Sequence, residues 1–172
     1  MLSVASLPSD RHIVVGFRTG KTPSSFKQFI IDEGLNKEIK IRGPFGEFRF
    51  RDDLKPVVLY ASGIVVTPII SLLKDVDNHN GRKIHVVYAS AGLYLFKEEM
   101  DKISKQNPNI EIVYTKAIED TQNELLKLAN KYGNNAYYYN SGALLVIKSV
   151  KQLLTKNKIK NKNLINDSFS GY

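Results

Sequence analysis

The sequence of 172 residues contains no cysteine. The chain therefore cannot form a disulfide, hold an iron–sulfur cluster with its own thiolates or use a thiol nucleophile. Its three histidines, His12, His79 and His85, lack the spacing of metal ligands. No run of residues is long and apolar enough to span a membrane, and the N-terminus lacks the basic start and apolar core of a signal peptide. We therefore expect a cytoplasmic protein with no metal site.

Basic residues outnumber acidic ones. Lysine and arginine number 25 against 17 acidic residues, which gives a formal net charge of +8. A basic surface can attract an acidic partner or nucleic acid. No aromatic residue lies among the late lysines, so a solvated surface is favoured over a nucleic-acid site. These lysines are Lys148, Lys151, Lys156, Lys158, Lys160 and Lys162.

Residues 57–70 predict the first half of a βαβ unit. Val57–Ala61 is an apolar run rich in β-branched residues, which is typical of a strand buried on both faces. Gly63 allows a turn, Thr67 is a good helix N-cap, and Pro68 suits the first helical position. The free amide groups at the start of such a helix favour a phosphate.

From Pro56 onward, strand-like and helix-like segments alternate. This alternation predicts an α/β fold with a doubly wound, parallel five-stranded sheet and helices on both faces. Ligands of such sheets bind at the carboxyl ends of the strands, which here carry Ser62–Gly63, Ser90–Gly92, Lys116 and Ser141–Gly142. The predicted strands are Val57–Ala61, Ile84–Ala89, Ile110–Thr115, Ala136–Asn140 and Asn163–Ile165. Four helices are predicted between these strands. The first starts at Thr67, the second runs through Met100, the third starts at a capping box at Thr121–Glu124, and the fourth runs from Leu144 to Asn157.

The first part of the chain, up to Asp53, has a different pattern. Short alternating segments such as Glu38–Ile41 predict antiparallel strands. Ser24 or Ser25 is placed to cap a short helix that ends at Gly34. Because this part is too small to close a barrel, we expect a partial antiparallel β-barrel domain at 1–53 and a parallel-sheet domain at 56–172.

Several motifs resemble, in the same order, those of the ferredoxin–NADP reductase superfamily, and together they cover nearly the whole chain. In that family a flavin-binding β-barrel precedes a nicotinamide-nucleotide domain. Leu2–Pro8 resembles the end of the Arg-x-Tyr-Ser flavin motif, Ser25–Lys27 the flavin pyrophosphate segment, and Gly43–Phe48 the Gly-Pro-x-Gly-x-Phe turn. Ala61–Pro68 resembles the Ala-Gly-Gly-x-Gly-x-Thr-Pro nucleotide turn, Tyr139–Gly142 the strand end before Gly-Pro-Pro, and Phe169–Tyr172 a C-terminal ending of some members.

The resemblance implies FAD and NAD(P)H as cofactors. It also implies an electron acceptor protein, such as ferredoxin or flavodoxin, as partner. Thr67 and Tyr172 would lie nearest the chemistry, with Thr67 at the flavin or nicotinamide and Tyr172 over the flavin ring. The cofactor-binding residues that it implies are Ser3, Ser25, Gly63, Thr67, Pro68, Ser90 and Gly142.

The chain departs from the family pattern on the flavin side. The Arg of the flavin motif would lie just before Met1, and Leu2 stands where the family usually has an aromatic residue. Most of the first barrel strands are missing as well. We therefore expect either a fragment, truncated at the N-terminus, or a barrel that a separate chain completes.

The nucleotide side departs from the pattern too. Ser62 and Val65 replace glycines of the nucleotide turn, and we expect the branched Val65 side chain to crowd a phosphate. The family's Gly-Pro-Pro appears as Gly142–Leu144. Ala91–Gly92 offers no guanidinium for a 2′-phosphate, which predicts a preference for NADH unless Lys97 substitutes.

These observations leave two functions open. The first is a flavin-dependent NAD(P)H oxidoreductase or electron-transfer subunit, which passes hydride between nicotinamide and FAD and electrons to an acceptor. The second, which the departures favour, is a degenerate, non-catalytic nucleotide-binding or interaction module. Flavin bound to the purified protein would separate the two.

Overall fold

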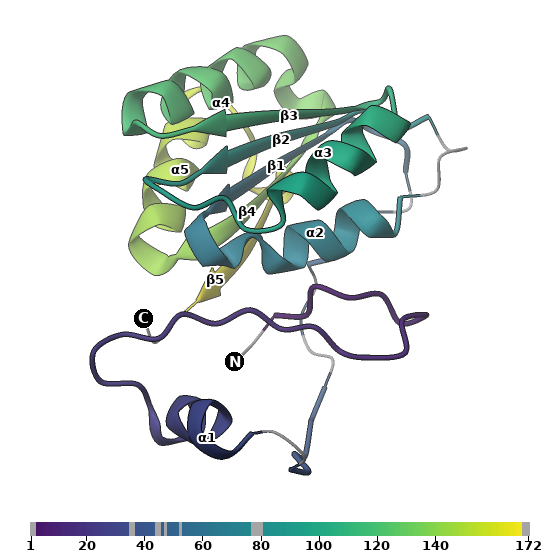
Figure 1. Cartoon of the computed structure of the whole chain (residues 1–172). Helices are drawn as coiled ribbons and strands as arrows, with labels where there is room; N and C mark the ends of the chain where they lie inside the picture. The colour runs from purple at the N-terminus through teal and green to yellow at the C-terminus, as the bar shows by residue number, and fades with distance from the viewer. Residues whose placement is uncertain are drawn as a thin grey trace.

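A five-stranded parallel sheet forms the centre of the structure (Figure 1). The computed structural model describes residues 3–34, 37–43, 46, 48–51, 53–76 and 81–169. The strands are β1 (Val57–Ser62), β2 (Ile84–Ala89), β3 (Ile110–Thr115), β4 (Tyr137–Ala143) and β5 (Leu164–Phe169). They lie in the order β3-β2-β1-β4-β5, and every neighbouring pair is parallel. The predicted α/β fold with a doubly wound parallel sheet is confirmed.

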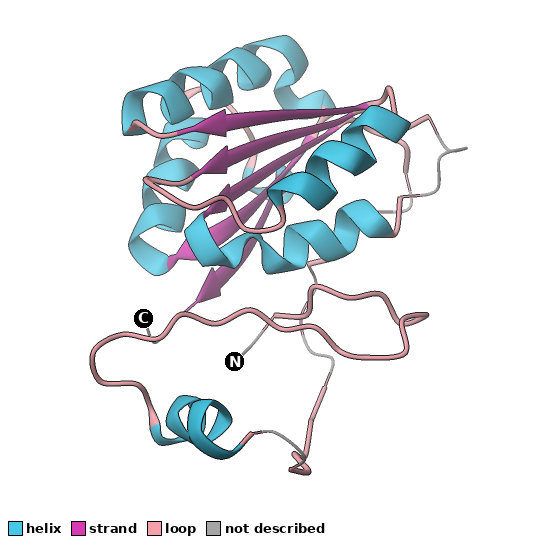
Figure 2. Ribbon diagram, in the orientation of Figure 1, coloured by secondary structure: helices cyan, strands magenta, loops and turns pink. Residues whose placement is uncertain are grey.

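Helices cover both faces of this sheet (Figure 2). One face carries α2 (Thr67–Lys74) and α3 (Lys97–Gln106), and the other carries α4 (Ile118–Tyr132) and α5 (Leu144–Lys156). Short 3₁₀ turns, η1 (Gly63–Val66), η2 (Gly133–Asn135) and η3 (Asn161–Asn163), join helices to strands. Each face buries its own cluster of aliphatic and aromatic side chains, as expected for strands that are apolar along their whole length.

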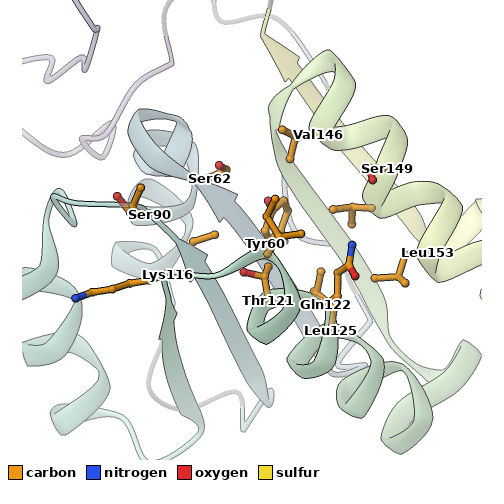
Figure 3. A pocket seen from close by; sticks show the side chains of 14 residues that line it. Tyr60, Ser62, Ser90, Lys116, Thr121, Gln122, Leu125, Val146, Ser149 and Leu153 are labelled. Atoms are coloured by element: carbon orange, nitrogen blue, oxygen red, sulfur yellow. The ribbon is translucent and has the colours of Figure 1, made fainter.

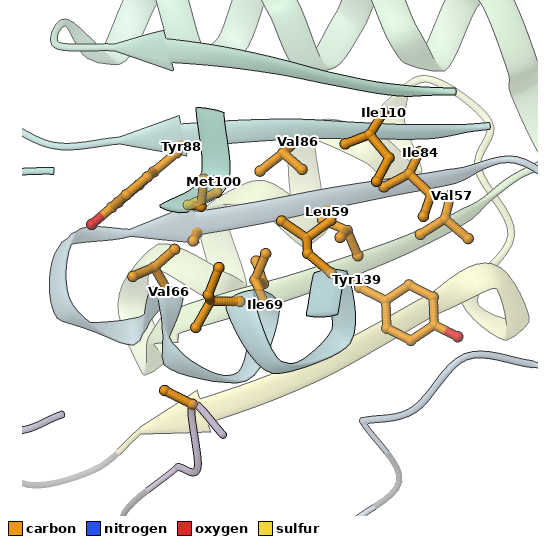
Figure 4. Close-up of a cluster of buried hydrophobic side chains, with 14 of the residues drawn as sticks. Val57, Leu59, Val66, Ile69, Ile84, Val86, Tyr88, Met100, Ile110 and Tyr139 are labelled. Atoms are coloured by element: carbon orange, nitrogen blue, oxygen red, sulfur yellow. The ribbon is translucent and has the colours of Figure 1, made fainter. Parts of the chain in front are cut away.

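The larger cluster lies between the sheet and the α2–α3 layer (Figure 4). Leu59 and Val86 from the strands meet Ile69 of α2 and Met100 of α3, and all four side chains are buried. Alternate strand residues, such as Val58, face the α4–α5 layer instead. Burial on both faces explains why the strands could be recognised from continuous apolar runs.

The predicted role of Thr67 as an N-cap is wrong. The 3₁₀ turn η1 runs directly into α2, so the residue before the helix is Val66, with helical angles of φ −70° and ψ −16°. An N-cap residue has extended angles, whereas Thr67 has φ −52° and ψ −46°. Thr67 is therefore the first residue of α2, and Pro68 follows it in the first turn.

The predicted capping box at Thr121 is also wrong, because α4 begins earlier, at Ile118. The Thr121 hydroxyl is buried, where it donates to the Ala117 carbonyl at 2.9 Å and pairs with the Thr115 hydroxyl at 2.7 Å. The partner at Thr115 comes from β3, so a local motif could not have revealed it. α4 ends at Tyr132, and Gly133 is its C-cap residue.

The part before β1 contains one described helix, α1 (Ser25–Glu33), and an isolated antiparallel bridge between Val4 and Val15. The expected antiparallel barrel strands are not confirmed by the described residues. Ile41, in the predicted strand Glu38–Ile41, is 65% exposed, and this segment forms no described strand pair. An alternating segment without a neighbour to pair with has no ladder to stabilise it.

The segment that leads into β1 is fixed to the sheet. The Tyr139 hydroxyl donates to the Arg49 carbonyl at 2.8 Å and accepts from the Arg51 amide at 3.2 Å. Phe48 and Phe50 both pack edge-on against the Tyr139 ring. Residues on both sides of the expected domain boundary are therefore in contact.

Candidate functional site

The sheet reverses its strand order at β1, which lies between β2 and β4. In open α/β sheets, ligands bind outside the carboxyl ends of the strands at this point. Here the carboxyl end of β1 leads into η1, and the Ser141 hydroxyl of β4 donates to the Val65 carbonyl of η1 at 2.7 Å. This buried bond ties the turn after β1 to the neighbouring strand.

Val65 does not crowd a ligand at this turn. Its side chain is only 3% exposed, because the 3₁₀ turn directs it into the core. The expectation that Val65 blocks a phosphate is therefore wrong. It rested on the family's glycine spacing, which does not show the direction of the side chain.

Gly63 is placed where the backbone needs a glycine. Its φ is +62°, a backbone conformation that is strained for any residue with a side chain. A Cβ built on Gly63 would lie 3.6 Å from Nη2 of Arg18, so a guanidinium from the first part of the chain lies beside this turn. The combination of a backbone turn and a cation suits an anionic ligand.

Thr67 lies behind the turn rather than in open space. It is 2% exposed, and a Cβ on Gly16 would come within 2.6 Å of its methyl carbon. The same Cβ would lie 3.2 Å from Ile64 Cδ1. Thr67 therefore packs against the segment that carries Arg18, at the contact between the first part of the chain and α2.

A cavity of about 350 Å³ opens at the same edge of the sheet, between the strand ends and the α4–α5 layer (Figure 3). Apolar side chains from α4 and α5, such as Leu125 and Val150, form its walls. Ser62 and Ser90 lie at one side, and Lys116 extends from the loop after β3 (Figure 3). An apolar cavity with a few polar groups at its rim is typical of a small-molecule site.

Two predicted cofactor-binding residues of the sheet edge have different surroundings. The Ser90 hydroxyl, at the cavity, donates to the Leu93 carbonyl at 2.8 Å and so shapes the loop after β2. Gly142 does not line the cavity. A Cβ there would lie 3.4 and 3.6 Å from side-chain carbons of Ile147 and Val146 of α5, at ordinary contact distance, so Gly142 faces α5.

The predicted flavin-side residues are far less enclosed. Ser25 is exposed and begins α1, whereas the N-cap is Ser24, whose hydroxyl accepts from the Lys27 amide at 3.5 Å. Ser3 is partly buried. Tyr172 lies outside the described residues. The roles of these residues stay predictions.

Two cations lie at this edge, and one of them, Arg18, was missed in the sequence. Arg18 and Lys116 come from segments nearly a hundred positions apart, and neither belongs to one of the quoted motifs. Lys116 was expected at the carboxyl end of a strand, and the structure places it directly after β3. The alternative cation, Lys97, pairs with Asp101 and lies over the Tyr114 ring, so it is engaged elsewhere.

The described residues include no cluster of three or more histidines or carboxylates arranged to hold a metal. His85 is buried, and its ring nitrogens lie 2.7 Å from the Tyr132 hydroxyl and 3.0 Å from a Glu111 carboxylate oxygen. No helix in the described part of the chain has the length and apolar content needed to cross a bilayer.

Asp167 of β5 is aligned with Ser141 of β4, and burial raises the pKa of its carboxyl group above the usual 3.8. A raised pKa in the folded state means that stability is greatest below the unfolded-state pKa and falls as the pH rises through the folded-state value. We expect Asp167→Asn to raise the free energy of unfolding near neutral pH and to lose this advantage at about pH 3. Urea unfolding at both pH values checks this. A variant less stable than wild type near neutral pH would contradict it.

Comparisons with known proteins agree with this arrangement. No family model matches the chain. A flavohemoprotein of Rhodopirellula baltica is 33% identical over 96 residues, which cover 53% of this chain and 22% of that protein. The matched segments span only about a quarter of the first curated relatives, between 22% and 28% of their length.

Solved structures extend the likeness to the whole chain. The flavohem-like FAD/NAD-binding domain of nitric oxide dioxygenase from Vibrio cholerae O1 biovar El Tor matches with a TM-score of 0.79 at 16% identity, over 99% of this chain and 76% of that one. Ferredoxin-NADP+ reductase from Plasmodium falciparum matches with a TM-score of 0.74 at 20% identity, over 98% of this chain and 76% of that one. These structures show that the chain has the fold of FAD/NAD-binding reductase domains, and the sequence relatives agree with its resemblance to the ferredoxin–NADP reductase superfamily.

Proposed function

We propose that the chain is the nucleotide-binding part of a flavin-dependent NAD(P)H oxidoreductase or electron-transfer subunit. It passes hydride between nicotinamide and FAD, and electrons to an acceptor protein such as ferredoxin or flavodoxin. The observation that carries the proposal is the cavity at the carboxyl ends of β1–β3, next to the strand-order reversal. The relatives' names, flavohemoprotein and ferredoxin-NADP+ reductase, support the class of reaction.

The residues present fit a dinucleotide. The cavity of about 350 Å³ is large enough for an adenosine, and its apolar walls suit a base. Gly63 has no side chain where a Cβ would point at Arg18, so phosphates can approach both the backbone and the guanidinium. Lys116 supplies a further cation at the cavity.

When bound, a nicotinamide supplies a hydride and a flavin accepts it and releases electrons singly. The chain's own residues bind and orient these groups, and no side chain needs to act as a general base. Thr67 and Gly16 hold the two parts of the chain in contact beside the turn at Gly63. Pro68 lies in the first turn of α2, where it has no amide that would need a partner.

On the flavin side, we propose that Ser3 and Ser25 contact FAD and that Tyr172 covers its ring, as the resemblance implies. Ser25 begins α1, and the amides of that first turn can donate hydrogen bonds to the oxygens of a pyrophosphate. We further propose that additional polypeptide is needed to complete this side, since Ile13 and Ile31 are 57% and 54% exposed.

The second candidate is a non-catalytic nucleotide-binding module. Ser62 in place of a glycine and the sequence Gly142–Leu144 in place of Gly-Pro-Pro favour it. The two candidates differ in reduction of an acceptor. If the chain is part of an enzyme, it should reduce a dye with NADH when flavin and the completing polypeptide are present. The rate of this reduction should saturate as the NADH concentration rises. NADH binding without reduction would favour the module.

Lys116 provides a test of the nucleotide site. We expect Lys116→Gln to weaken NADH binding by about three- to tenfold, because the nucleotide loses a charge-assisted hydrogen bond to phosphate. Calorimetric titration measures this, and Lys105→Gln at the end of α3 is the control with the same change in net charge. Equal weakening in both variants would contradict a specific contact.

The same titrations test nucleotide choice. The loop at Ala91–Gly92 has no guanidinium and Lys97 is engaged with Asp101, so we expect wild type to bind NADH more tightly than NADPH. Tighter binding of NADPH would overturn this expectation, and a larger loss for NADPH in Lys116→Gln would then identify Lys116 as the 2′-phosphate contact.

A further inference from the structure

Three tyrosines pack together at the carboxyl edge, on the face of the sheet that α2 and α3 cover. The ring centroids of Tyr88 and Tyr94 are 5.1 Å apart and nearly perpendicular, at 85°. Tyr94 and Tyr114 are 5.0 Å apart at 70°. Edge-to-face pairs of this kind stabilise beyond the area they bury, so the cluster contributes to the stability of this edge.

The hydroxyl groups of this cluster bond to the loops after the strands. Tyr88 Oη donates to the Gly63 carbonyl at 3.0 Å and accepts from the Leu95 amide at 3.0 Å. Tyr94 Oη donates to the Thr115 carbonyl at 2.8 Å. Tyr88 and Tyr94 thereby join three segments: the turn after β1, the loop after β2 and the end of β3.

These three segments are the ones that carry the proposed nucleotide contacts. Gly63 is the glycine of the turn beside Arg18, Ser90 lies in the same loop as Leu95, and Lys116 directly follows Thr115. Tyr88 itself is fully buried and lies behind the site, in the core cluster (Figure 4). Burial raises the pKa of Tyr88, so its hydroxyl remains a donor at physiological pH.

We propose that Tyr88 is a positioning residue for nucleotide binding, which holds the Gly63 turn and the loop after β2 in the geometry that the nucleotide needs. This inference rests on the proposed function. Tyr88 touches no ligand and acts through the Gly63 carbonyl and the Leu95 amide. Without its hydroxyl, the turn gains alternative conformations, and binding must then restrict them.

Tyr88→Phe tests the role, because phenylalanine keeps the ring and removes only the hydroxyl. Tyr138→Phe is the matched control. Tyr138 is equally buried, and its hydroxyl donates to the Gly133 carbonyl at 2.9 Å, at the end of α4 and away from the cavity. Both variants lose a buried hydrogen bond, so both should lose stability in urea unfolding.

The two variants should differ in binding. We expect Tyr88→Phe to weaken NADH affinity about three- to tenfold in calorimetric titration, and Tyr138→Phe to leave it unchanged. Hydrogen exchange of the unliganded protein should speed up at Gly63–Val66 and at Leu95 in Tyr88→Phe only. If Tyr88→Phe has the NADH affinity and the hydrogen exchange of wild type, the role of Tyr88 is overturned, and the proposed function still stands. A wild-type chain that binds neither NADH nor NADPH would overturn the proposed function, and the role of Tyr88 with it.

Discussion

Replacement of Val65 by glycine is expected to lower the free energy of unfolding by about 2–4 kcal/mol. The side chain is 3% exposed, so the variant loses most of the burial of a valine and gains backbone freedom in the unfolded chain. Urea unfolding measures the change. Val113→Gly on β3, where the valine is 38% exposed, is the control for the backbone contribution and should lose less.

The same variant separates two accounts of the nucleotide turn. The family's spacing predicts that a glycine at position 65 improves nucleotide affinity by restoring access to the backbone. The structure predicts no improvement, because the Val65 side chain faces the core and only its carbonyl, bound by Ser141, faces β4. Tighter NADH binding by Val65→Gly would show that the side chain does meet the ligand.

The second large effect concerns flavin. We expect the chain alone to bind FAD weakly or not at all, and a polypeptide that supplies the first barrel strands to tighten binding about a hundredfold or more. The physical reason is the open apolar surface before β1. It includes Val4, Ile13, Val15, Phe26, Ile31, Ile39, Ile41 and Leu54, all more than a third exposed. Covering these residues orders the segments that would hold the flavin.

An absorbance scan and hydrogen exchange check this together. The completing polypeptide should bring a flavin band and new protection at Ile13–Phe17, while the protection of β1 and β4 stays unchanged. A shuffled polypeptide of the same composition is the control. A stoichiometric flavin band, or strong and uniform protection across Ile13–Phe17, in the isolated chain would show that the chain is self-sufficient.

The sheet could be predicted from sequence because its strands are apolar on both faces. The predicted β2 and β3 match the structure, and β1, β4 and β5 differ only at their ends. Helix starts were harder to predict. Thr67 and Thr121 both have a capping residue type, but one follows a 3₁₀ turn and the other bonds to Thr115 of a neighbouring strand. Tertiary contacts of this kind decide helix starts, and local spacing does not contain them.

The site was only partly predictable for a related reason. Gly63 and Ser90 could be found because small residues at strand ends follow a known rule for α/β sheets. Arg18 could not be found in this way. It reaches the same edge through a segment that forms only the isolated bridge at Val15 in the structure, so it does not lie at the end of a sheet strand. Tyr88 looks like an ordinary core residue in sequence, and only the position of its hydroxyl between two loops indicates a role.

The central claim is that the carboxyl edge of this sheet binds a nicotinamide nucleotide. Titration of the ¹⁵N-labelled chain with NADH tests it most directly, because each backbone amide reports its own surroundings. The predicted result is saturable shifts at Ser62–Gly63, at Ser90 and at Lys116, with Lys105 at the opposite edge unchanged. Shifts confined to the lysines of α5, or no shifts at millimolar NADH, would contradict the claim.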